Sequence, residues 1–360
     1  MHEARLARAR ARMGDFGIDV LLCSIGPDLP YLTGYEAMPL ERLTMLVVPR
    51  DAEAVLIVPR LEAPRVEERP GVFTIEAWDE TDDPVARVCA HVHGARRVAI
   101  GDQTWARFVL ALQRSLPDAQ LSSASEVMSP LRVVKDAGEI ALLQAAATVV
   151  DGIALVMRER PFAGRTEHDV HRELVERMLD GGHDRANFAI VATGPNAASP
   201  HHDPTDRVIA PGDVVLCDFG GTRKGYCSDI TRMFSVGAPS AEVRDAYEAL
   251  VEAQEAAVAA AVVGTACEAV DRVARDVLGA AGLGDRFVHR TGHGIGIDAH
   301  EDPYLVAGNT DPLVAGHAFS IEPGVYLPGE FGLRLEDIVV ATESGPRRLN
   351  QAARDLAIVG

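Results

Sequence analysis

Four carboxylates and one histidine in the second half of the chain have the residue types of a metal centre. They are Asp218, Asp229, His293, Glu322 and Glu336. Apolar runs typical of buried strands precede Asp218 and Glu322 and follow Glu336. Burying several ionised carboxylates together costs more than a fold tolerates, unless their pKa values rise sharply or cations neutralise them. Two divalent metals would neutralise them, and such metals prefer a mostly oxygen ligand set.

An internal repeat predicts how these groups come together. Residues 166–169 and 265–268 lie 99 positions apart, and each has the pattern of a capping box that opens an amphipathic helix. The same offset carries His201 onto His300, and a similar shift relates the apolar runs before the two strand-borne acids. Each half thus supplies two acids and one histidine. We therefore predict two α/β halves around a pseudo-twofold axis, with these groups meeting between them.

Local spacing adds two expectations. The turn-rich segment 220–225 lies between Asp218 and Asp229, so a hairpin would place the two aspartates side by side. Strand alternation puts Arg334 and Glu336 on one face. Arg334 then either binds substrate, by orienting a ligand carboxylate, or forms a structural ion pair.

Other residues have two interpretations each. His201 and His202 compete for one place in the site, and the repeat offset favours His201. Tyr226 either lines the substrate pocket or packs in the core. His289 and His317 have no partner in the repeat, so we interpret both as structural.

Composition indicates an intracellular enzyme. The chain has 360 residues with 53 acidic against 35 basic residues, and its formal charge of -18 disfavours nucleic acid and anionic membranes as partners. Five cysteines without C-x-x-C spacing suit a reducing compartment. The N-terminus lacks an apolar signal region, and we expect no stretch long enough to span a bilayer. These features predict a cytoplasmic protein with a small or peptidic ligand.

The first 125 residues or so alternate short apolar runs with helical patterns, which indicates an α/β domain with a central sheet. Its clearest strand candidates are residues 19–23, 43–48, 54–58 and 97–100. We predict a non-catalytic domain over residues 1–128, a connector over 129–136 and a catalytic domain over 137–360.

Six segments carry a resemblance to a known family. They are Asp218-Phe219-Gly220, Ser228-Asp229-Ile230-Thr231-Arg232, Thr291-Gly292-His293-Gly294-Ile295-Gly296, His300-Glu301-Asp302-Pro303, Ile321-Glu322-Pro323-Gly324-Val325-Tyr326 and Arg334-Leu335-Glu336-Asp337. Together they resemble the prolidase and aminopeptidase P group of the methionine-aminopeptidase-like metallopeptidases. One small departure is Ala299, where a β-branched residue commonly precedes the histidine.

The resemblance implies a creatinase/prolidase-type N-terminal domain and a pita-bread catalytic domain. It also implies a homodimer, two divalent metals per subunit (manganese first, cobalt or zinc otherwise), and cleavage of the bond before proline by a metal-bridging hydroxide.

The resemblance also implies a role for each site residue. Asp218 would bind one metal, Asp229 and Glu336 would bridge both, and His293 and Glu322 would bind the other. His201 and His300 would contact the substrate, either polarising the scissile carbonyl or stabilising the tetrahedral intermediate and the departing proline nitrogen. Glu322 would also shuttle a proton.

Of the possible functions we favour an Xaa-Pro dipeptidase, because the chain has two domains and no long insertions. An Xaa-Pro aminopeptidase acting on longer peptides is the alternative within the same chemistry. A methionine aminopeptidase normally lacks the N-terminal domain, and a creatinase-like enzyme would have lost several ligands. A catalytically silent binding module would not keep the full set of ligands and histidines.

Overall fold

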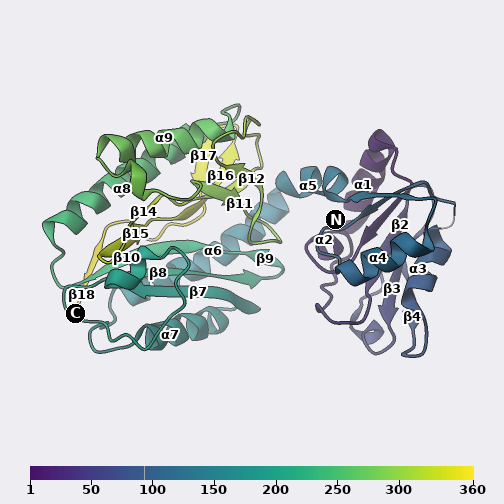
Figure 1. The fold of residues 1–360 in the computed structure, drawn as a ribbon, viewed down its shortest axis with the longest axis horizontal. Helices are drawn as coiled ribbons and strands as arrows, with labels where there is room; N and C mark the ends of the chain where they lie inside the picture. The colour runs from purple at the N-terminus through teal and green to yellow at the C-terminus, as the bar shows by residue number, and fades with distance from the viewer. Residues whose placement is uncertain (93) are drawn as a thin grey trace. The chain divides into compact units, whose positions relative to one another are not determined.

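The chain divides between Arg132 and Val133 into two units in the computed structural model, which describes residues 1–92 and 94–360 (Figure 1). The division falls inside the predicted connector. The first residues of that connector are helical, because α5 (Ser125–Val133) continues through them with Pro130 inside the helix.

The first unit is built on a six-stranded mixed sheet with the order β4-β3-β2-β1-β5-β6. Its strands are β1 (Val20–Cys23), β2 (Met45–Pro49), β3 (Ala54–Pro59), β4 (Phe73–Trp78), β5 (Arg97–Ile100) and β6 (Gln120–Ser123). Its other elements are α1 (His2–Phe16), α2 (Asp28–Thr33), η1 (Ala63–Arg65), α3 (Pro84–Val92) and α4 (Ala106–Ser115), followed by α5. Apolar side chains of β1, β2, β3 and β5 pack with Val88 of α3 and Leu112 of α4. All four predicted strands are present, and β4 and β6 are additional.

The second unit contains two five-stranded sheets and a two-stranded ribbon. The first sheet has the order β18-β10-β8-β7, with β9 paired to β8, and consists of β7 (Arg185–Thr193), β8 (Val214–Arg223), β9 (Tyr226–Cys227), β10 (Ile230–Val236) and β18 (Ala357–Val359). The second has the order β12-β11-β13-β16-β17 and consists of β11 (Gly292–Gly294), β12 (Glu301–Leu305), β13 (Ala318–Ile321), β16 (Asp337–Thr342) and β17 (Gly345–Arg348). The ribbon pairs β14 (Gly324–Leu327) with β15 (Phe331–Arg334).

Two pairs of long helices cover these sheets on opposite sides (Figure 1). They are α6 (Ala137–Met157) with α7 (Glu167–Asp180), and α8 (Ala241–Ala260) with α9 (Cys267–Ala280); η2 (Gly194–Ala198) and η3 (Gly284–Arg286) are short. The first pair shares an apolar core with β7, β8 and β10, and the second shares one with the ribbon, β13 and β16. This is the arrangement of two α/β halves that the internal repeat predicts.

The repeat is shifted by one residue from its predicted register at the second helix. Helix α7 opens with the expected capping box, in which the Asp169 amide donates to Thr166 Oγ1 at 3.1 Å. Helix α9 instead has Ala266 as its N-cap without a side-chain cap, so the predicted box at residues 265–268 is wrong. The Glu268 carboxylate accepts from the Gly308 amide, at 3.1 Å.

Backbone carbonyls replace the missing cap. The first amides of α9, from Cys267 and Glu268, donate to the carbonyls of Asp311 and Asn309. The first two amides of α7 bind the carbonyls of residues 207 and 205 in the same way. A helix start whose amides are already satisfied by backbone gains little from a side-chain cap, and the sequence pattern does not reveal this.

Helix α6 also differs from expectation. It is long and apolar enough to cross a membrane by length and composition alone, whereas we predicted no such stretch. A single helix of this kind is weak support for a membrane span. Within this unit Val150 and Met157 of α6 pack against α7 and the first sheet.

Candidate active site

A hairpin positions the two aspartates. Strands β8 and β10 pair antiparallel with Asp218 opposite Thr231, and Asp229 immediately precedes β10. A Cβ atom at Gly220 would lie 2.1 Å from the Ser228 carbonyl oxygen, so only glycine permits this close approach of β8 to the segment just before β10. The predicted hairpin is confirmed.

The other three candidate ligands lie within or next to strands of the second half. Glu322 directly follows β13, and the Ser320 hydroxyl donates to its Oε1 at 2.9 Å. The same hydroxyl accepts the amide of His293 in β11, at 3.0 Å. Glu336 lies between β15 and β16, where Thr231 Oγ1 donates to its Oε2 at 2.8 Å. Thr231 thereby links the two halves.

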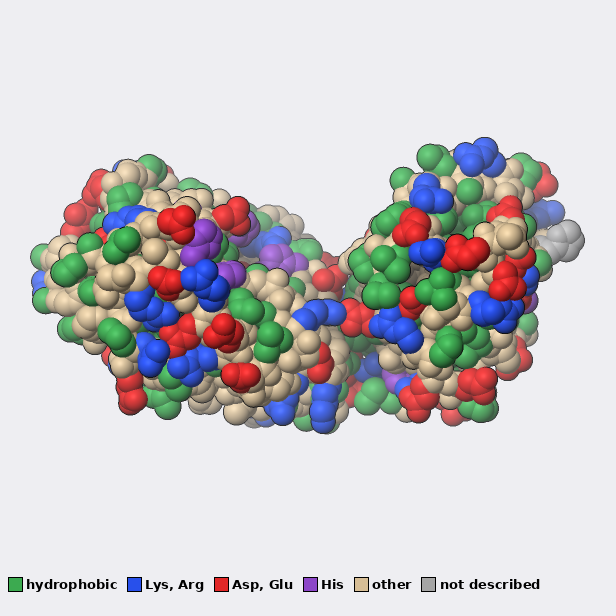
Figure 2. All heavy atoms as spheres, turned by 90° about the horizontal axis from the view of Figure 1, so that it is seen from below, with side chains coloured by type: hydrophobic (Ala, Val, Ile, Leu, Met, Phe, Trp, Pro, Cys, Tyr) green, Lys and Arg blue, Asp and Glu red, His purple; other side chains and the backbone are tan. Residues whose placement is uncertain are grey.

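These groups line one cavity of about 860 Å³ in the second unit. Its lining residues are Phe188, Ile190, Ser199, Pro200, His201, Asp218, Asp229, Val288, His289, Arg290, His293, His300, Glu322, Arg334 and Glu336. All five predicted ligands are present, with both predicted histidines and Arg334. Figure 2 shows histidine side chains gathered beside acidic and basic ones on the visible face of this unit, at the left of the view.

The geometry of the acids fits metal ions. One ligand atom each from Asp218, Asp229 and Glu336 lies within 4.8 Å of the others, and the same holds for His293, Glu322 and Glu336. Glu336 therefore belongs to both groups. The buried oxygens Asp218 Oδ1, Asp229 Oδ1 and Glu336 Oε1 have no hydrogen-bond partner within the described ranges. Because a buried carboxylate oxygen normally has a partner, such a set fits cations as the missing partners.

Electrostatics agree with this interpretation. Burial raises the pKa of Asp229 well above its ordinary value, and repulsion from Asp218 and Glu322 adds to the shift. Burial likewise raises the pKa of Glu336, with repulsion from Asp229 next in importance. Burial acts in the same direction on Glu322, but the hydrogen bond and charge of His293 outweigh it and lower the pKa of Glu322 to about 2. A cation beside Asp229 and Glu336 would favour their ionised forms and so offset the cost of burying these two carboxylates together.

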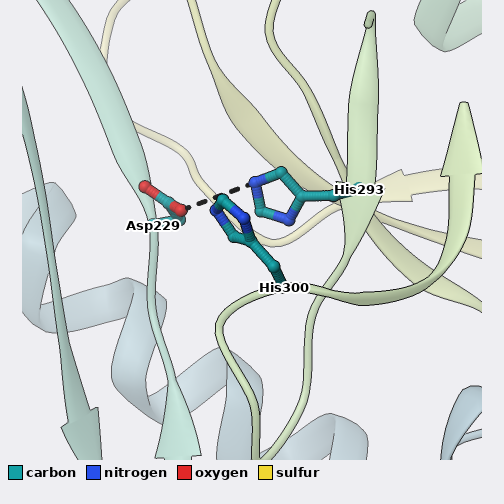
Figure 3. Close-up of side chains that lie close together, drawn as sticks. All are labelled: Asp229, His293 and His300. Atoms are coloured by element: carbon teal, nitrogen blue, oxygen red, sulfur yellow. Dashed lines mark ion pairs between the residues drawn. The ribbon is translucent and has the colours of Figure 1, made fainter. Parts of the chain in front are cut away.

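His293 is oriented for coordination. Its Nδ1 lies 3.1 Å from the Gly294 carbonyl oxygen, so the proton of a neutral ring belongs on Nδ1. Nε2 lies 3.1 Å from Glu322 Oε1 and 4.0 Å from Asp229 Oδ2, so it is the nitrogen that would coordinate a metal ion after giving up the proton it shares with Glu322. Figure 3 shows the rings of His293 and His300 lying close together beside Asp229, with ring centroids 3.8 Å apart.

His300 can also reach the ligand cluster. One of its nitrogens groups with Asp229 and His293 within 4.8 Å. Burial, followed by the neighbouring charges of His293 and Arg290, lowers the pKa of His300 to about 4. The imidazole is therefore neutral at pH 7. A neutral ring is suited to accept or donate a hydrogen bond rather than to hold a charge.

Both Nη atoms of Arg334 donate hydrogen bonds within the protein. Its Nη2 donates to Asp218 Oδ2 at 2.5 Å, and its Nη1 donates to the Tyr326 hydroxyl at 2.7 Å and to the Pro200 carbonyl at 3.1 Å. The side chain is 2 % exposed. Of the two interpretations, this geometry is that of the structural ion pair, made by a residue that also forms part of the cavity wall. As strand alternation predicts, Glu336 shares this face, whereas Asp337 bonds to Arg232.

Tyr226 lies away from the cavity. It is in β9, buried in an apolar cluster with Ile295 and Val340, and its hydroxyl donates to Glu139 Oε1 at 2.9 Å. The interpretation of Tyr226 as a substrate-binding residue is therefore wrong. The short strand β9 pairs with the far end of β8, where Tyr226 is opposite Arg223.

Histidine 289, interpreted above as structural, lines the cavity. Its Nε2 lies 2.8 Å from the Tyr326 hydroxyl, which is also bound by Arg334. Sequence reasoning missed this pair and the apolar wall made by Phe188 and Ile190. Tyr326 is the last residue of the segment 321–326 that contains Glu322. This position was the one sequence feature that could have indicated Tyr326 as part of the site.

The two adjacent histidines separate as the repeat offset favours. His201 lines the cavity, whereas His202 Nε2 lies 3.0 Å from the carboxylate of Glu167, the first residue of α7. Helix α7 was predicted, but no pattern in the sequence indicated that Glu167 would lie against this loop.

Comparison with known proteins shows the family of the chain. Residues 140–343 match the sequence model of metallopeptidase family M24, and residues 5–134 match that of the creatinase/prolidase N-terminal domain. The chain belongs to metallopeptidase family M24. The M24 match contains the five candidate ligands, and the catalytic unit has the pita-bread fold of that family.

Individual relatives place the chain within the prolidase group of M24. It is 42% identical to the probable dipeptidase PepE of Mycobacterium bovis, over 100% of this chain and 97% of that protein. It is 33% identical to the Xaa-Pro dipeptidase of Lactobacillus helveticus, over 96% of each. The crystal structure of the prolidase from Thermococcus sibiricus has a TM-score of 0.93 at 37% identity and covers 99% of this chain and 98% of that one. The protein is thus an M24 metallopeptidase.

Proposed function

We propose that this cavity hydrolyses the peptide bond before proline in dipeptides. The observation that carries the proposal is the set of three buried carboxylates, each with an oxygen that has no partner within the described ranges, facing a cavity that His201 and His300 also line. The relatives named as an Xaa-Pro dipeptidase and a prolidase support the choice of substrate.

The residues fit two divalent ions. Asp218, Asp229 and Glu336 would hold one ion, and His293 and Glu322 would hold the other with Asp229 and Glu336 shared between them. Bound there, the ions would lower the pKa of a shared water so that hydroxide is available to attack the scissile carbonyl near neutral pH. We propose manganese, because this mostly oxygen set with one imidazole suits it, and cobalt or zinc as substitutes.

The histidines act on the substrate. His201 and His300 line the cavity beside the acids, where they would hydrogen-bond the carbonyl oxygen as negative charge develops on it. Glu322 would carry a proton to the departing proline nitrogen. Arg334 would hold Asp218 in place rather than bind substrate directly.

The cavity wall suits a small substrate with an apolar ring. Phe188, Ile190 and Val288 provide apolar surface on one part of the lining, and the charged Arg290 lies on another. Apolar walls with a few placed polar groups are the usual composition of a small-molecule site. A half-buried cation such as Arg290 would attract the terminal carboxylate of a dipeptide.

We also propose a cytoplasmic homodimer. All five cysteines are free thiols, as a reducing compartment requires. The dimer follows from the family resemblance, and sedimentation velocity measures it directly.

Hydrolysis of four peptides tests the proposal. Chelator-stripped enzyme is assayed on Ala-Pro, Ala-Ala, Ala-Pro-Ala and Met-Ala-Ala, with and without added manganese. We expect metal-restored cleavage of Ala-Pro well above the other three. Asp229→Ala is the control, and it should remain folded but inactive with reduced metal content.

Each other outcome points to a different function. Release of Ala from Ala-Pro-Ala would indicate an Xaa-Pro aminopeptidase, and equal cleavage of Ala-Ala and Ala-Pro would indicate a dipeptidase without preference for proline. Silence on all four peptides with metal demonstrably bound would instead favour a binding module on the same fold.

A further inference from the structure

The segment that carries His201 is an irregular loop. Residues 194–205 leave β7 through the short helix η2 and then run without regular structure. Such a loop has few internal hydrogen bonds, so contacts with its surroundings must hold it in place. A catalytic side chain on it is only as well placed as those contacts make it.

The side chain of Glu167 supplies most of these contacts. Oε1 accepts from the Thr193 amide and hydroxyl, at 2.9 and 2.8 Å, and from Asn196 Nδ2 at 3.0 Å. Oε2 accepts from the Thr205 amide and hydroxyl at 3.0 and 2.6 Å, and it lies 3.0 Å from His202 Nε2. One carboxylate thus binds both ends of the loop and the residue next to His201.

Glu167 itself has little freedom. Its side chain is 0 % exposed and projects from the first turn of α7, where the helix N-terminus favours negative charge. Burial raises the pKa of its carboxyl, but hydrogen bonds from Thr205, His202, Asn196 and Thr193 outweigh that effect and lower the pKa to about 2. The carboxylate is therefore ionised at neutral pH, and donors of the loop compensate its charge.

The opposite side of the loop rests on the ribbon next to the acids. Arg334 donates to the Pro200 carbonyl at 3.1 Å, one residue before His201. A Cβ atom at Gly332 in β15 would lie 1.8 Å from the Ala197 carbonyl oxygen, so β15 and the loop backbone are in close contact. The loop therefore lies between Glu167 and β15, and His201 faces the cavity.

We propose that Glu167 is a positioning residue for catalysis: it fixes the loop 194–205 through His202, Asn196 and Thr205 and so holds His201 against the substrate. The proposal rests on the proposed role of His201 in substrate hydrolysis. Glu167 does not line the cavity, so its effect on turnover would pass through His201.

A double-mutant cycle tests this directly. In Glu167→Gln, an amide NH₂ replaces one carboxylate oxygen and faces donors of the loop. We expect turnover of Ala-Pro to fall on the order of 10²-fold, as in His201→Ala, with metal content unchanged. The double variant should be no slower than His201→Ala alone, because residues that act through one another are not additive. Glu167→Asp should recover part of the activity.

Asp271 offers a matched control in the other half. It is 1 % exposed, and it accepts from the Thr291 amide and hydroxyl at 3.1 and 2.8 Å, two residues before His293. Asp271→Asn should weaken metal binding, measured by isothermal titration with manganese. Its loss of turnover should add to that of His201→Ala, since it does not act on the loop.

Hydrogen–deuterium exchange separates the possible failures. Faster exchange in residues 194–205 of metal-loaded Glu167→Gln supports positioning, whatever His201 does in turnover. Unchanged exchange there, or a loss of turnover that adds fully to His201→Ala, would overturn the proposal. If Glu167→Gln slows turnover and His201→Ala does not, the proposed role of His201 is wrong. Hydrogen–deuterium exchange then still decides whether Glu167 holds the loop. If Glu167→Gln does not fold, Thr205→Val replaces it in the double-mutant cycle and in the exchange experiment.

Discussion

Arg334 binds one oxygen of Asp218 and leaves the other oxygen toward the ligand cluster. Nη2 lies 2.5 Å from Oδ2, while Oδ1 is buried without a partner within the described ranges. Although burial would lower the pKa of Arg334, the negative groups around it outweigh this effect and raise that pKa well above its usual value, so the guanidinium is always charged. It offsets part of the acidic cluster before any metal binds.

This relationship predicts how Arg334→Met behaves. Removing the cation leaves Asp218 as a buried carboxylate without its charged partner, so the metal-free protein should lose about 3 kcal/mol of stability. Bound manganese would neutralise the carboxylate and recover much of that loss. Urea unfolding with and without manganese checks this, and an equal loss in both states would contradict it.

The raised pKa values of Asp229 and Glu336 predict a pH dependence of the metal-free protein. Both groups bind protons more tightly when folded. Their contribution to stability is therefore fully present below the ordinary carboxyl pKa and is lost as pH rises through the folded values. The metal-free double variant Asp229→Asn/Glu336→Gln has no such carboxyl groups to ionise. Its melting temperature, relative to that of the metal-free wild type, should therefore rise between pH 5 and pH 8.

Added manganese should make the wild type more stable than the double variant at pH 8. The wild-type protein binds the ions at pH 8 and gains stability, whereas the double variant gains little. Parallel melting temperatures of the two metal-free proteins across this pH range would show that the acids do not titrate as their burial requires.

His300 should contribute to rate without contributing a titration near pH 6.5. Its pKa is lowered to about 4, so its ring is neutral throughout pH 5–9. We expect His300→Gln to keep both metals, to lose on the order of 10²-fold in turnover of Ala-Pro, and to show the same shape of pH profile as the wild type. Metal analysis accompanies the kinetics. A metal-depleted His300→Gln would make His300 a ligand, which its nearness to Asp229 and His293 also permits.

Sequence patterns were sufficient to predict the candidate metal ligands, because each of these residues lies within a strand or next to one. The apolar runs before Asp218 and Glu322 are strands β8 and β13, and the turn-rich segment after Asp218 is a hairpin. The strand β6 was not predicted, because the edge strand Gln120–Ser123 is largely polar and partly exposed, and so lacks an alternating pattern.

Contacts between distant segments were beyond the sequence. Helix α7 and strand β7 separate Glu167 from the loop that it binds. Tyr226 has the same residue type as Tyr326 but lies in the core. The Tyr326 hydroxyl contacts His289 and Arg334 of the cavity wall. Which of the two tyrosines does so depends on pairing register and loop path, and short-range patterns do not encode these.

A buried ion pair beside His300 gives the last prediction. Lys135 Nζ lies 2.7 Å from Glu301 Oε1, and the two side chains are only 1% and 5% exposed. Glu301 follows His300 directly, and a Cβ atom at Gly296 would lie 2.5 Å from the Oε1 atom of Glu301, so the ion pair is tightly packed.

Lys135→Met leaves a buried carboxylate without this partner and should cost about 3–5 kcal/mol of stability in urea unfolding, most of which Lys135→Met/Glu301→Gln should restore. Arg158→Met is the control, because its pair with Asp355 is 30% and 61% exposed and should be worth less than about 1 kcal/mol. Equal effects of Lys135→Met and Arg158→Met would mean that the Lys135–Glu301 pair contributes no more than a surface contact.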